Sequence, residues 1–174
     1  MVARGAARRE YNEPVGNRRE TNMLKVHNPR SIAAPIGTYS HGIEVPPGAR
    51  WLHVAGQIGV RPDGSVPATI EEQTEVVWQN ILAVLADAGM GIGDVVKITS
   101  FLTRHENFAR FAQVRAKFLG SHRPASTLLV ISSLARPEFL VEVEAFAAKA
   151  SAPKNPARRP SIRRAGKAKR RARR

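Results

Sequence analysis

The sequence predicts an α+β domain over residues 25–150, in which two helices lie on one face of a single β-sheet. Two observations predict this class. Five short segments rich in β-branched and aromatic residues alternate with turns and with two longer segments of helical period, in the order β-β-α-β-α-β-β. Each helical segment has a single apolar face, so both helices can cover the same side of one sheet.

Charge separates this domain from the two ends of the chain. The 174 residues carry a formal net charge of +14, but residues 25–150 contain 12 basic and 11 acidic residues and are nearly neutral. Residues 151–174 contain 11 Lys or Arg and no Asp or Glu. We interpret them as a disordered basic tail that attracts nucleic acid without sequence specificity. Residues 1–24 are polar and are interpreted as a flexible extension.

Composition excludes several classes of function. The chain has no cysteine, so it forms no disulfide, thiol nucleophile or zinc–thiolate site. It contains no run of ~20 apolar residues, the length that a membrane helix requires, and its first twenty residues lack the apolar segment of a secretory signal. The five histidines lack metal-ligand spacing. We therefore expect a cytoplasmic protein without a metal site or a membrane partner.

In the first half of the domain, Thr38–Glu44 and Trp51–Gly56 are predicted strands, joined by a Pro-Pro-Gly turn. A helix is expected to begin after Thr69, because Thr69 and Glu72 have the spacing of a capping box. Gly89 is expected to end this helix. The apolar stripe of the helix consists of Val77, Trp78, Ile81, Leu82 and Leu85.

The second half predicts a strand over Asp94–Thr103, a helix over His105–Leu119, and strands over Ser126–Ser133 and Phe139–Ala147. The face of the sheet that the helices leave uncovered is too apolar for water, so we expect other copies of the chain to cover it. The aromatic residues expected on the inner face of the second helix are Phe108, Phe111 and Phe118.

Two local motifs do not predict the chemistry that they first suggest. The segment Gly89–Gly93 (GMGIG) follows a helix rather than a strand, so it indicates a helix end and a turn and not a dinucleotide-binding loop. Ser40 and His41 are adjacent in a predicted strand and point to opposite faces, which prevents a nucleophile–base pair.

Glu142 and Glu144 are the most informative carboxylates. In the last predicted strand they share one face with Leu140 and Phe146, while the residues between them face the other side. One interpretation is a solvated polar face. The other is a pair of carboxylates among large apolar neighbours, a setting in which a glutamate can hold or activate a water molecule.

Four blocks of the chain occur in order over Pro35–Ala147: IGTYSHGIEV, LHVAGQIGVRPDGSVP, EEQTEVVWQNILAVLADAGMGIGDVVKITSFL, and PAST followed by LARPEFLVEVEAFA. Together they resemble the Rid (reactive intermediate deaminase) family, also known as YjgF-like proteins or endoribonuclease L-PSP. The resemblance implies a chorismate-mutase-like fold and a homotrimer with its site between subunits. It also implies hydrolysis of reactive imines and enamines to 2-oxo acids and ammonia, without a metal or an organic cofactor.

The family's functional residues carry over with one exception. The resemblance implies that Glu142 positions the attacking water and that Tyr39 and Gly56 line the pocket. Ser126 stands where the family has an arginine that pairs with the substrate carboxylate, and Thr127 follows it. A serine hydroxyl brings no charge, so we expect the standard deaminase activity to be altered or lost.

The sequence leaves the function open among three alternatives. In the first, a homotrimer binds a small carbonyl- or imine-like metabolite between subunits and hydrolyses it, with water positioned by Glu142 and polar contacts supplied by Ser126 or Thr127. Arg123 and Arg136 are the candidates for the missing cation. In the second, a non-catalytic trimer binds a small carbonyl- or imine-like metabolite. In the third, residues 151–174 bind RNA or DNA without sequence specificity.

Overall fold

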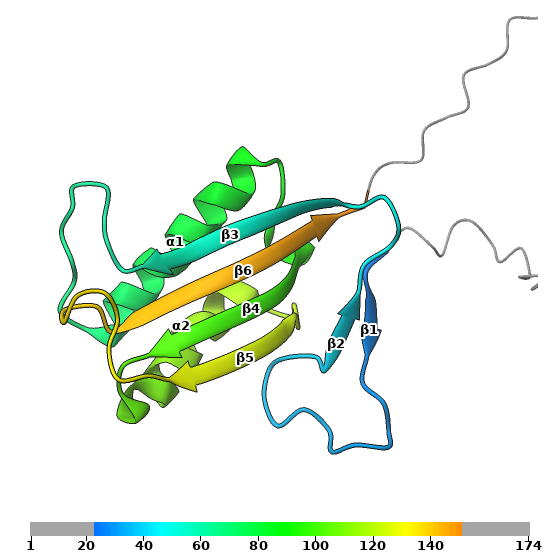
Figure 1. Ribbon diagram of the computed structural model, residues 1–174, viewed down its shortest axis with the longest axis horizontal. Helices are drawn as coiled ribbons and strands as arrows, with labels where there is room; N and C mark the ends of the chain where they lie inside the picture. The colour runs from blue at the N-terminus through cyan, green and yellow to red at the C-terminus, as the bar shows by residue number, and fades with distance from the viewer. Residues whose placement is uncertain (1–22, 151–174) are drawn as a thin grey trace, which may run out of the picture.

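A computed structural model describes residues 23–150 of the chain. Their main feature is a four-stranded sheet with the order β3-β6-β4-β5, in which β5 is parallel to β4 and the other neighbours are antiparallel (Figure 1). Two helices cover one face of this sheet. The strands are β3 (Arg50–Ile58), β4 (Val95–Leu102), β5 (Ala125–Val130) and β6 (Val141–Lys149), and the helices are α1 (Ile70–Asp87) and α2 (Phe108–Leu119).

Helix α1 begins and ends where the sequence predicts. Thr69 is its N-cap, and the Thr69 hydroxyl accepts a hydrogen bond from the Glu72 backbone N–H at 3.3 Å and donates one to the Glu72 carboxylate at 2.9 Å. Gly89, just after the helix, has φ +66°, a left-handed conformation that favours glycine. The segment after it turns through a short 3-10 helix, Ile92–Asp94, into β4, which confirms the prediction of a helix end and a turn.

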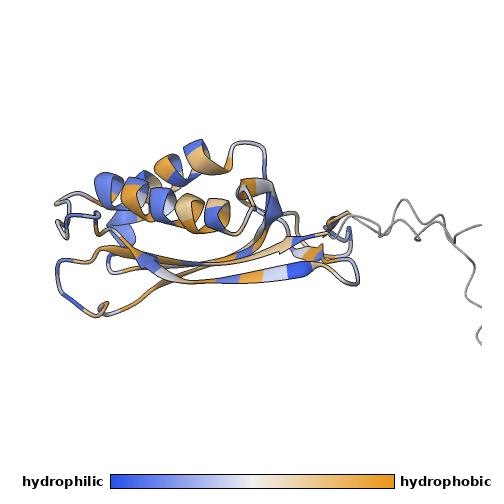
Figure 2. Cartoon of the chain, turned by 90° about the horizontal axis from the view of Figure 1, so that it is seen from above, coloured by the Kyte–Doolittle hydropathy of each residue, from blue (hydrophilic) through white to orange (hydrophobic). Residues whose placement is uncertain are grey.

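The core lies between the two helices and the sheet, and the opposite face of the sheet has no helix over it (Figure 2). Trp78 of α1 is fully buried and stacks on Phe118 of α2, with ring centroids 6.1 Å apart. Phe111 is buried as predicted, but Phe108 is 48% exposed. Phe108 is the first residue of α2, and the buried position there is taken by Asn107, which closes the short 3-10 helix His105–Asn107.

The prediction of a single sheet is wrong in one respect. The first predicted strand shortens to β2 (Gly42–Glu44), which pairs with an unpredicted strand β1 (Lys25–His27) in a separate two-stranded sheet. Just before β2, an isolated β-bridge pairs Ser40 with Ala125 at the edge of the main sheet. The connection between β2 and β3 contains two prolines, which lack backbone N–H donors and so cannot extend the hydrogen-bond ladder of either strand.

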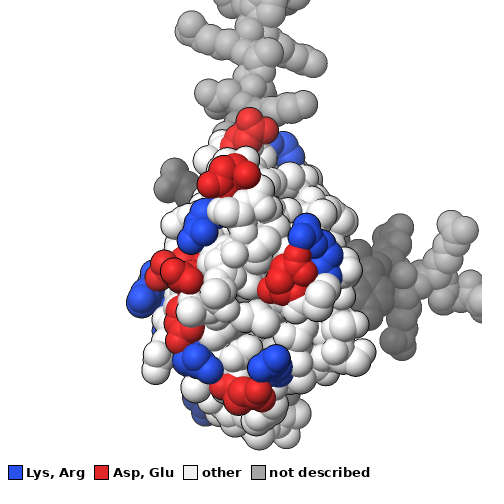
Figure 3. All heavy atoms as spheres, turned by 90° about the vertical axis from the view of Figure 1, so that its left-hand side faces the viewer, with Lys and Arg blue, Asp and Glu red and all other residues white. Residues whose placement is uncertain are grey.

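Basic and acidic side chains are mixed on the end of the domain where β6 begins. Viewed from the end where β6 begins, Lys and Arg side chains alternate with Asp and Glu side chains (Figure 3). This pattern agrees with the near-neutral composition of residues 25–150. Within residues 23–150, no helix is long and apolar enough to cross a bilayer.

Candidate functional site

The sheet face opposite the helices, here called the open face, carries the candidate carboxylates. Across the sheet, Glu142 pairs with Phe101 and Glu144 pairs with Thr99. The buried residues that alternate with the carboxylates, Val141, Val143 and Ala145, point toward the helices, as the alternation predicts. The side chains of the open face are Trp51, His53, Lys97, Thr99, Phe101, Thr127, Leu129, Glu142, Glu144 and Phe146.

Gly56 and Glu142 are in direct contact. The register of β3 against β6 shifts between Val54 and Gln57, so Gly56 lies in an irregular stretch beside β6. A Cβ atom added to Gly56 would lie 2.7 Å from Cδ of Glu142 and 3.0 Å from its Cγ. Any side chain at position 56 would therefore displace the carboxylate. The glycine is needed here because the Glu142 side chain lies so close to the backbone, and not because of its backbone conformation.

The Glu142 carboxylate has apolar neighbours and free hydrogen-bonding capacity. Its partners in the strand registers are Ile58 of β3 and Phe101 of β4. Among the described residues, Glu142 forms no ion pair and accepts no side-chain hydrogen bond. A partly buried carboxylate with these neighbours can accept a hydrogen bond from a water molecule and take its proton.

Ser126 and Thr127 are adjacent in β5 and point to opposite faces. Thr127 lies on the open face, where the Lys97 ammonium donates a hydrogen bond to its hydroxyl. Burial lowers the pKa of Lys97. Ser126 lies on the helix side, where its hydroxyl accepts a hydrogen bond from Nη2 of Arg115 in α2 at 3.2 Å. The same Nη2 donates to the Thr38 carbonyl at 3.4 Å.

Arg115 was missed by sequence reasoning, which considered Arg123 and Arg136 as replacements for the absent arginine. Arg123, in the connection between α2 and β5, donates to the backbone carbonyls of Gly120 and His122 at 2.7 and 3.0 Å. Arg136 pairs with Glu138 and lies over the Phe139 ring, 5.2 Å from its centroid. The spacing of position 115 is a signal that could have found it, because it lies four residues after Phe111 and three before Phe118 and so puts a cation on the side of α2 that packs on the domain.

Tyr39 lies at the end of the sheet where β5 begins. Its ring meets the His41 ring edge-on, with centroids 5.9 Å apart. The next residue, Ser40, donates from its hydroxyl to the Arg123 carbonyl at 2.6 Å and from its N–H to the Pro124 carbonyl at 3.1 Å. These bonds attach Tyr39 to the start of β5, close to Ser126.

The site residues predicted from the sequence therefore fall into two groups within one chain. Gly56 and Glu142 form the first group, and Tyr39 and Ser126 belong to the second. Ser126 of β5 and Ala145 of β6 lie opposite the same residue of β4, so they are in register two strands apart. Ala145 is three residues along β6 from Glu142. The separation is roughly 10 Å along the strands and roughly 10 Å across them, so one small ligand cannot contact both groups in a single chain.

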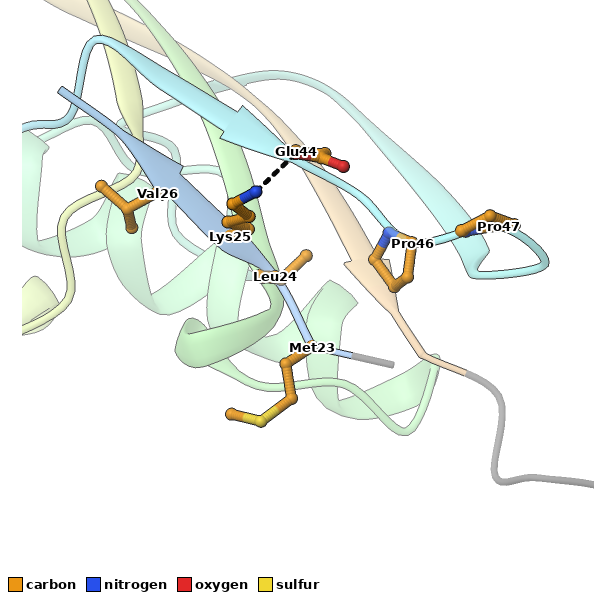
Figure 4. Close-up of a pocket in the computed structure, with 7 residues that line it drawn as sticks. All are labelled: Met23, Leu24, Lys25, Val26, Glu44, Pro46 and Pro47. Atoms are coloured by element: carbon orange, nitrogen blue, oxygen red, sulfur yellow. Dashed lines mark ion pairs between the residues drawn. The ribbon is translucent and has the colours of Figure 1, made fainter. Parts of the chain in front are cut away.

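Two surface hollows lie at the end of the domain where β1 and β2 pair, and neither includes Gly56 or Glu142. The first is closed at one side by an ion pair between Lys25 and Glu44 at 3.9 Å, and it is lined by Met23, Leu24, Lys25, Val26, Glu44, Pro46 and Pro47 (Figure 4). The second adjoins the group of Tyr39. The residues that line it include Asn28, Tyr39, Ser40, Leu119, His122 and Arg123.

Comparison with solved structures defines the class of protein. The Rid family protein YyfB of Yersinia pestis superposes with a TM-score of 0.64 at 32% identity, over 71% of this chain and 97% of that one. Escherichia coli TdcF, solved with bound serine, gives a TM-score of 0.56 at 28% identity, over 72% of this chain and 99% of that one. The fold is thus that of the YjgF/Rid proteins.

Sequence comparison identifies the family. Residues 30–149 match the family model described as endoribonuclease L-PSP, and the chain belongs to this family. A RutC family protein of Pyrococcus horikoshii is 37% identical over 73% of this chain and 99% of its own length. TdcF of Escherichia coli, provisionally named a reactive intermediate deaminase, is 27% identical over 74% of this chain and its full length.

Proposed function

We propose that the protein is a homotrimeric hydrolase of small imines and enamines, with Glu142 as its general base in a site between subunits. The observation that carries the proposal is the Glu142 carboxylate lying over Gly56, between apolar neighbours and without a partner among the described residues. This arrangement puts a carboxylate that can accept a proton from water on the face proposed to form the site.

The proposed chemistry needs one water and no redox step. An enamine first tautomerises to its imine. The water oxygen attacks the imine carbon while Glu142 takes a proton from the water, and a C–O bond forms as the C=N π bond opens onto nitrogen. The proton passes from Glu142 to that nitrogen and gives an amino alcohol. Glu142 then takes the proton of the new hydroxyl group and delivers it to the amino nitrogen as the C=O bond forms and the C–N bond breaks. Ammonia leaves and a carbonyl compound remains. Glu142 ends the cycle as a carboxylate.

Two features support a site between subunits. The open face exposes large apolar side chains, because Trp51 is 51% exposed and Leu129 is 42% exposed, on the same face as the rings of Phe101 and Phe146. Packing these faces together would bury them. The separation of Tyr39 from Glu142 within one chain is also what a site shared by two chains requires.

The relatives support the class of substrate. TdcF carries the provisional name of a reactive intermediate deaminase, and its solved structure holds serine, an amino acid with a carboxylate. We therefore propose imines of small 2-oxo acids as substrates. The carboxylate of such a substrate needs a cationic partner, and Ser126 cannot supply one.

The shared site can be tested by mixing two inactive variants. We expect Glu142→Gln and Tyr39→Ala each to lose most imine hydrolysis, measured with an amino-acid oxidase as the source of imine. If one site takes Glu142 from one chain and Tyr39 from its neighbour, randomly mixed trimers contain both native groups at about a quarter of their sites. Co-refolded mixtures should recover about a quarter of the wild-type rate, and light scattering should show a trimer.

Each contrary result has a distinct meaning. A monomer in solution, or a mixture as inactive as its parents, would contradict a site shared between chains. A wild-type protein that does not accelerate imine hydrolysis would contradict the hydrolase. If small 2-oxo acids nevertheless raised its melting temperature, the protein would be a non-catalytic metabolite-binding trimer.

A second proposal concerns residues 151–174, which lie outside the described residues. We propose that their 11 Lys and Arg bind RNA or DNA without sequence specificity. Affinity for a single-stranded oligonucleotide should fall steeply with salt, with a slope of about −0.7 per phosphate contacted. Deleting residues 151–174, or replacing their Lys and Arg with Gln, should abolish binding. Equal binding by the truncated protein at the same ionic strength would contradict the proposal.

A further inference from the structure

We infer that Arg115 binds the carboxylate of the ligand in place of the strand arginine that Ser126 replaces. The inference rests on the proposed function, because it concerns the same site and names the residue that selects an anionic substrate. The carbonyl or imine carbon would then face Glu142 of the adjacent subunit.

The hydrogen bonds of Arg115 leave its guanidinium incompletely satisfied. Nη2 donates to the Ser126 hydroxyl and to the Thr38 carbonyl, at 3.2 and 3.4 Å. Nε is buried and donates to nothing in the described part of the chain. Nη1 has no hydrogen-bond partner in that part of the chain either, but unlike Nε it is accessible to solvent. A carboxylate arriving from solvent would provide the acceptors that this planar donor group lacks.

The charge around Arg115 is unbalanced, unlike that around the other cations of α2. Arg110 lies 3.7 Å from the Glu71 carboxylate, and Lys117 lies 3.8 Å from that of Glu75. Arg115 has no acidic partner among the described residues. Burial, and next the positive charge of Arg123, lower the pKa of Arg115. A half-buried guanidinium beside a second guanidinium is costly for the free protein, and a bound anion would offset that cost.

The position of Arg115 also suits a ligand near Tyr39. The Thr38 carbonyl that it contacts immediately precedes Tyr39, and Arg123 lines the same hollow as Tyr39. Ser126 holds the guanidinium from the side of the sheet. Position 126 would thus orient a cation supplied by α2, whereas the family's arginine at this position supplies the cation directly.

Binding of pyruvate, the smallest 2-oxo acid, tests the inference in the full chain. Isothermal titration should show that Arg115→Gln weakens pyruvate binding by about tenfold or more, the usual effect of losing a charge-assisted pair. Arg110→Gln is the matched control on the same helix and should change affinity by less than about twofold. Methyl pyruvate, which has no negative charge, should bind weakly to all three proteins. Equal binding of pyruvate by wild type and Arg115→Gln, or no binding to wild type, would overturn the inference.

A second measurement does not depend on how the variant folds. The Nε–H of Arg115 is buried, so its proton should exchange slowly and give a resolved signal in a ¹⁵N-correlated NMR spectrum of the wild-type trimer. Arg115→Lys identifies this signal by its loss. Pyruvate should shift it and methyl pyruvate should not. A signal that pyruvate leaves unchanged at saturation would overturn the inference.

The two proposals fail in different ways. If the wild type hydrolyses imines and Arg115→Gln leaves KM unchanged, the hydrolase stands and the role of Arg115 is wrong. If pyruvate binds through Arg115 and no imine is hydrolysed, the anion site stands and the hydrolase is wrong. We also expect the melting temperature of Arg115→Gln to be equal to or a few degrees above that of wild type, because the substitution removes an uncompensated buried charge.

Discussion

Replacing Glu142 with glutamine is expected to lower the rate of imine hydrolysis by about 10²-fold or more, the usual contribution of a positioned general base. Glutamine keeps the size of the side chain and its place over Gly56 but cannot accept the proton of the attacking water. The measurement is kcat in a continuous assay with an amino-acid oxidase as the imine source. Pyruvate affinity should change by less than about threefold, because the carboxylate of the ligand lies away from Glu142.

Glu144→Gln is the matched control for this substitution. Glu144 lies two residues along the same strand on the same face, opposite Thr99, and is not in contact with Gly56. Its replacement should leave kcat within about threefold of wild type. Equal losses in the two variants would show that the open face needs negative charge in general. Full activity of Glu142→Gln would remove Glu142 from the mechanism.

The substitution Gln73→Leu is expected to lower the free energy of unfolding by a large amount. Gln73 is 1% exposed and bridges two loops through three hydrogen bonds. Its amide donates to the carbonyls of Pro67 and Glu138, and its carbonyl accepts from the Leu140 N–H, all at 2.8 Å. Leucine would leave three backbone groups unsatisfied at a cost of about 1–3 kcal/mol each, so we expect a total loss of about 3–5 kcal/mol.

Urea unfolding at a fixed protein concentration measures this loss, since the stability of an oligomer depends on concentration. Gln79→Leu is the control, because Gln79 is exposed on the same helix and its replacement should change stability by less than about 0.5 kcal/mol. Activity of Gln73→Leu should also fall, because the Leu140 bond fixes the chain two residues before Glu142. Wild-type stability in Gln73→Leu would mean that water replaces the three lost bonds.

The parts of the fold that could be predicted from sequence are those encoded within a few residues. The Thr69 cap, the Gly89 stop and the apolar stripe of α1 lie where local spacing places them, because capping and helical period depend on neighbours in the chain. Gln73 occupies the position one turn before Val77 on that stripe. It was not singled out from the sequence, and its hydrogen-bond partners are 6 to 67 residues away in sequence, so no local pattern names them.

The candidate site divides in the same way. Alternation in the last strand correctly puts Glu142 and Glu144 on the face opposite the core. The close approach of Glu142 to Gly56 depends on a register shift between two strands that are far apart in sequence. The contact between Ser126 and Arg115 depends on how α2 packs beside β5.

By itself, the sequence determined the class of fold, the apolar faces of α1 and of the last strand, and the absence of a cationic residue at position 126. The tertiary structure alone decided that β2 leaves the main sheet to pair with β1, that Gly56 supports Glu142, and that a guanidinium from α2 reaches Ser126. The physical reason is how far apart in the sequence the interacting residues lie. Side-chain period and turn chemistry act between neighbours along the chain, whereas register and packing are fixed by many contacts between distant segments that form together.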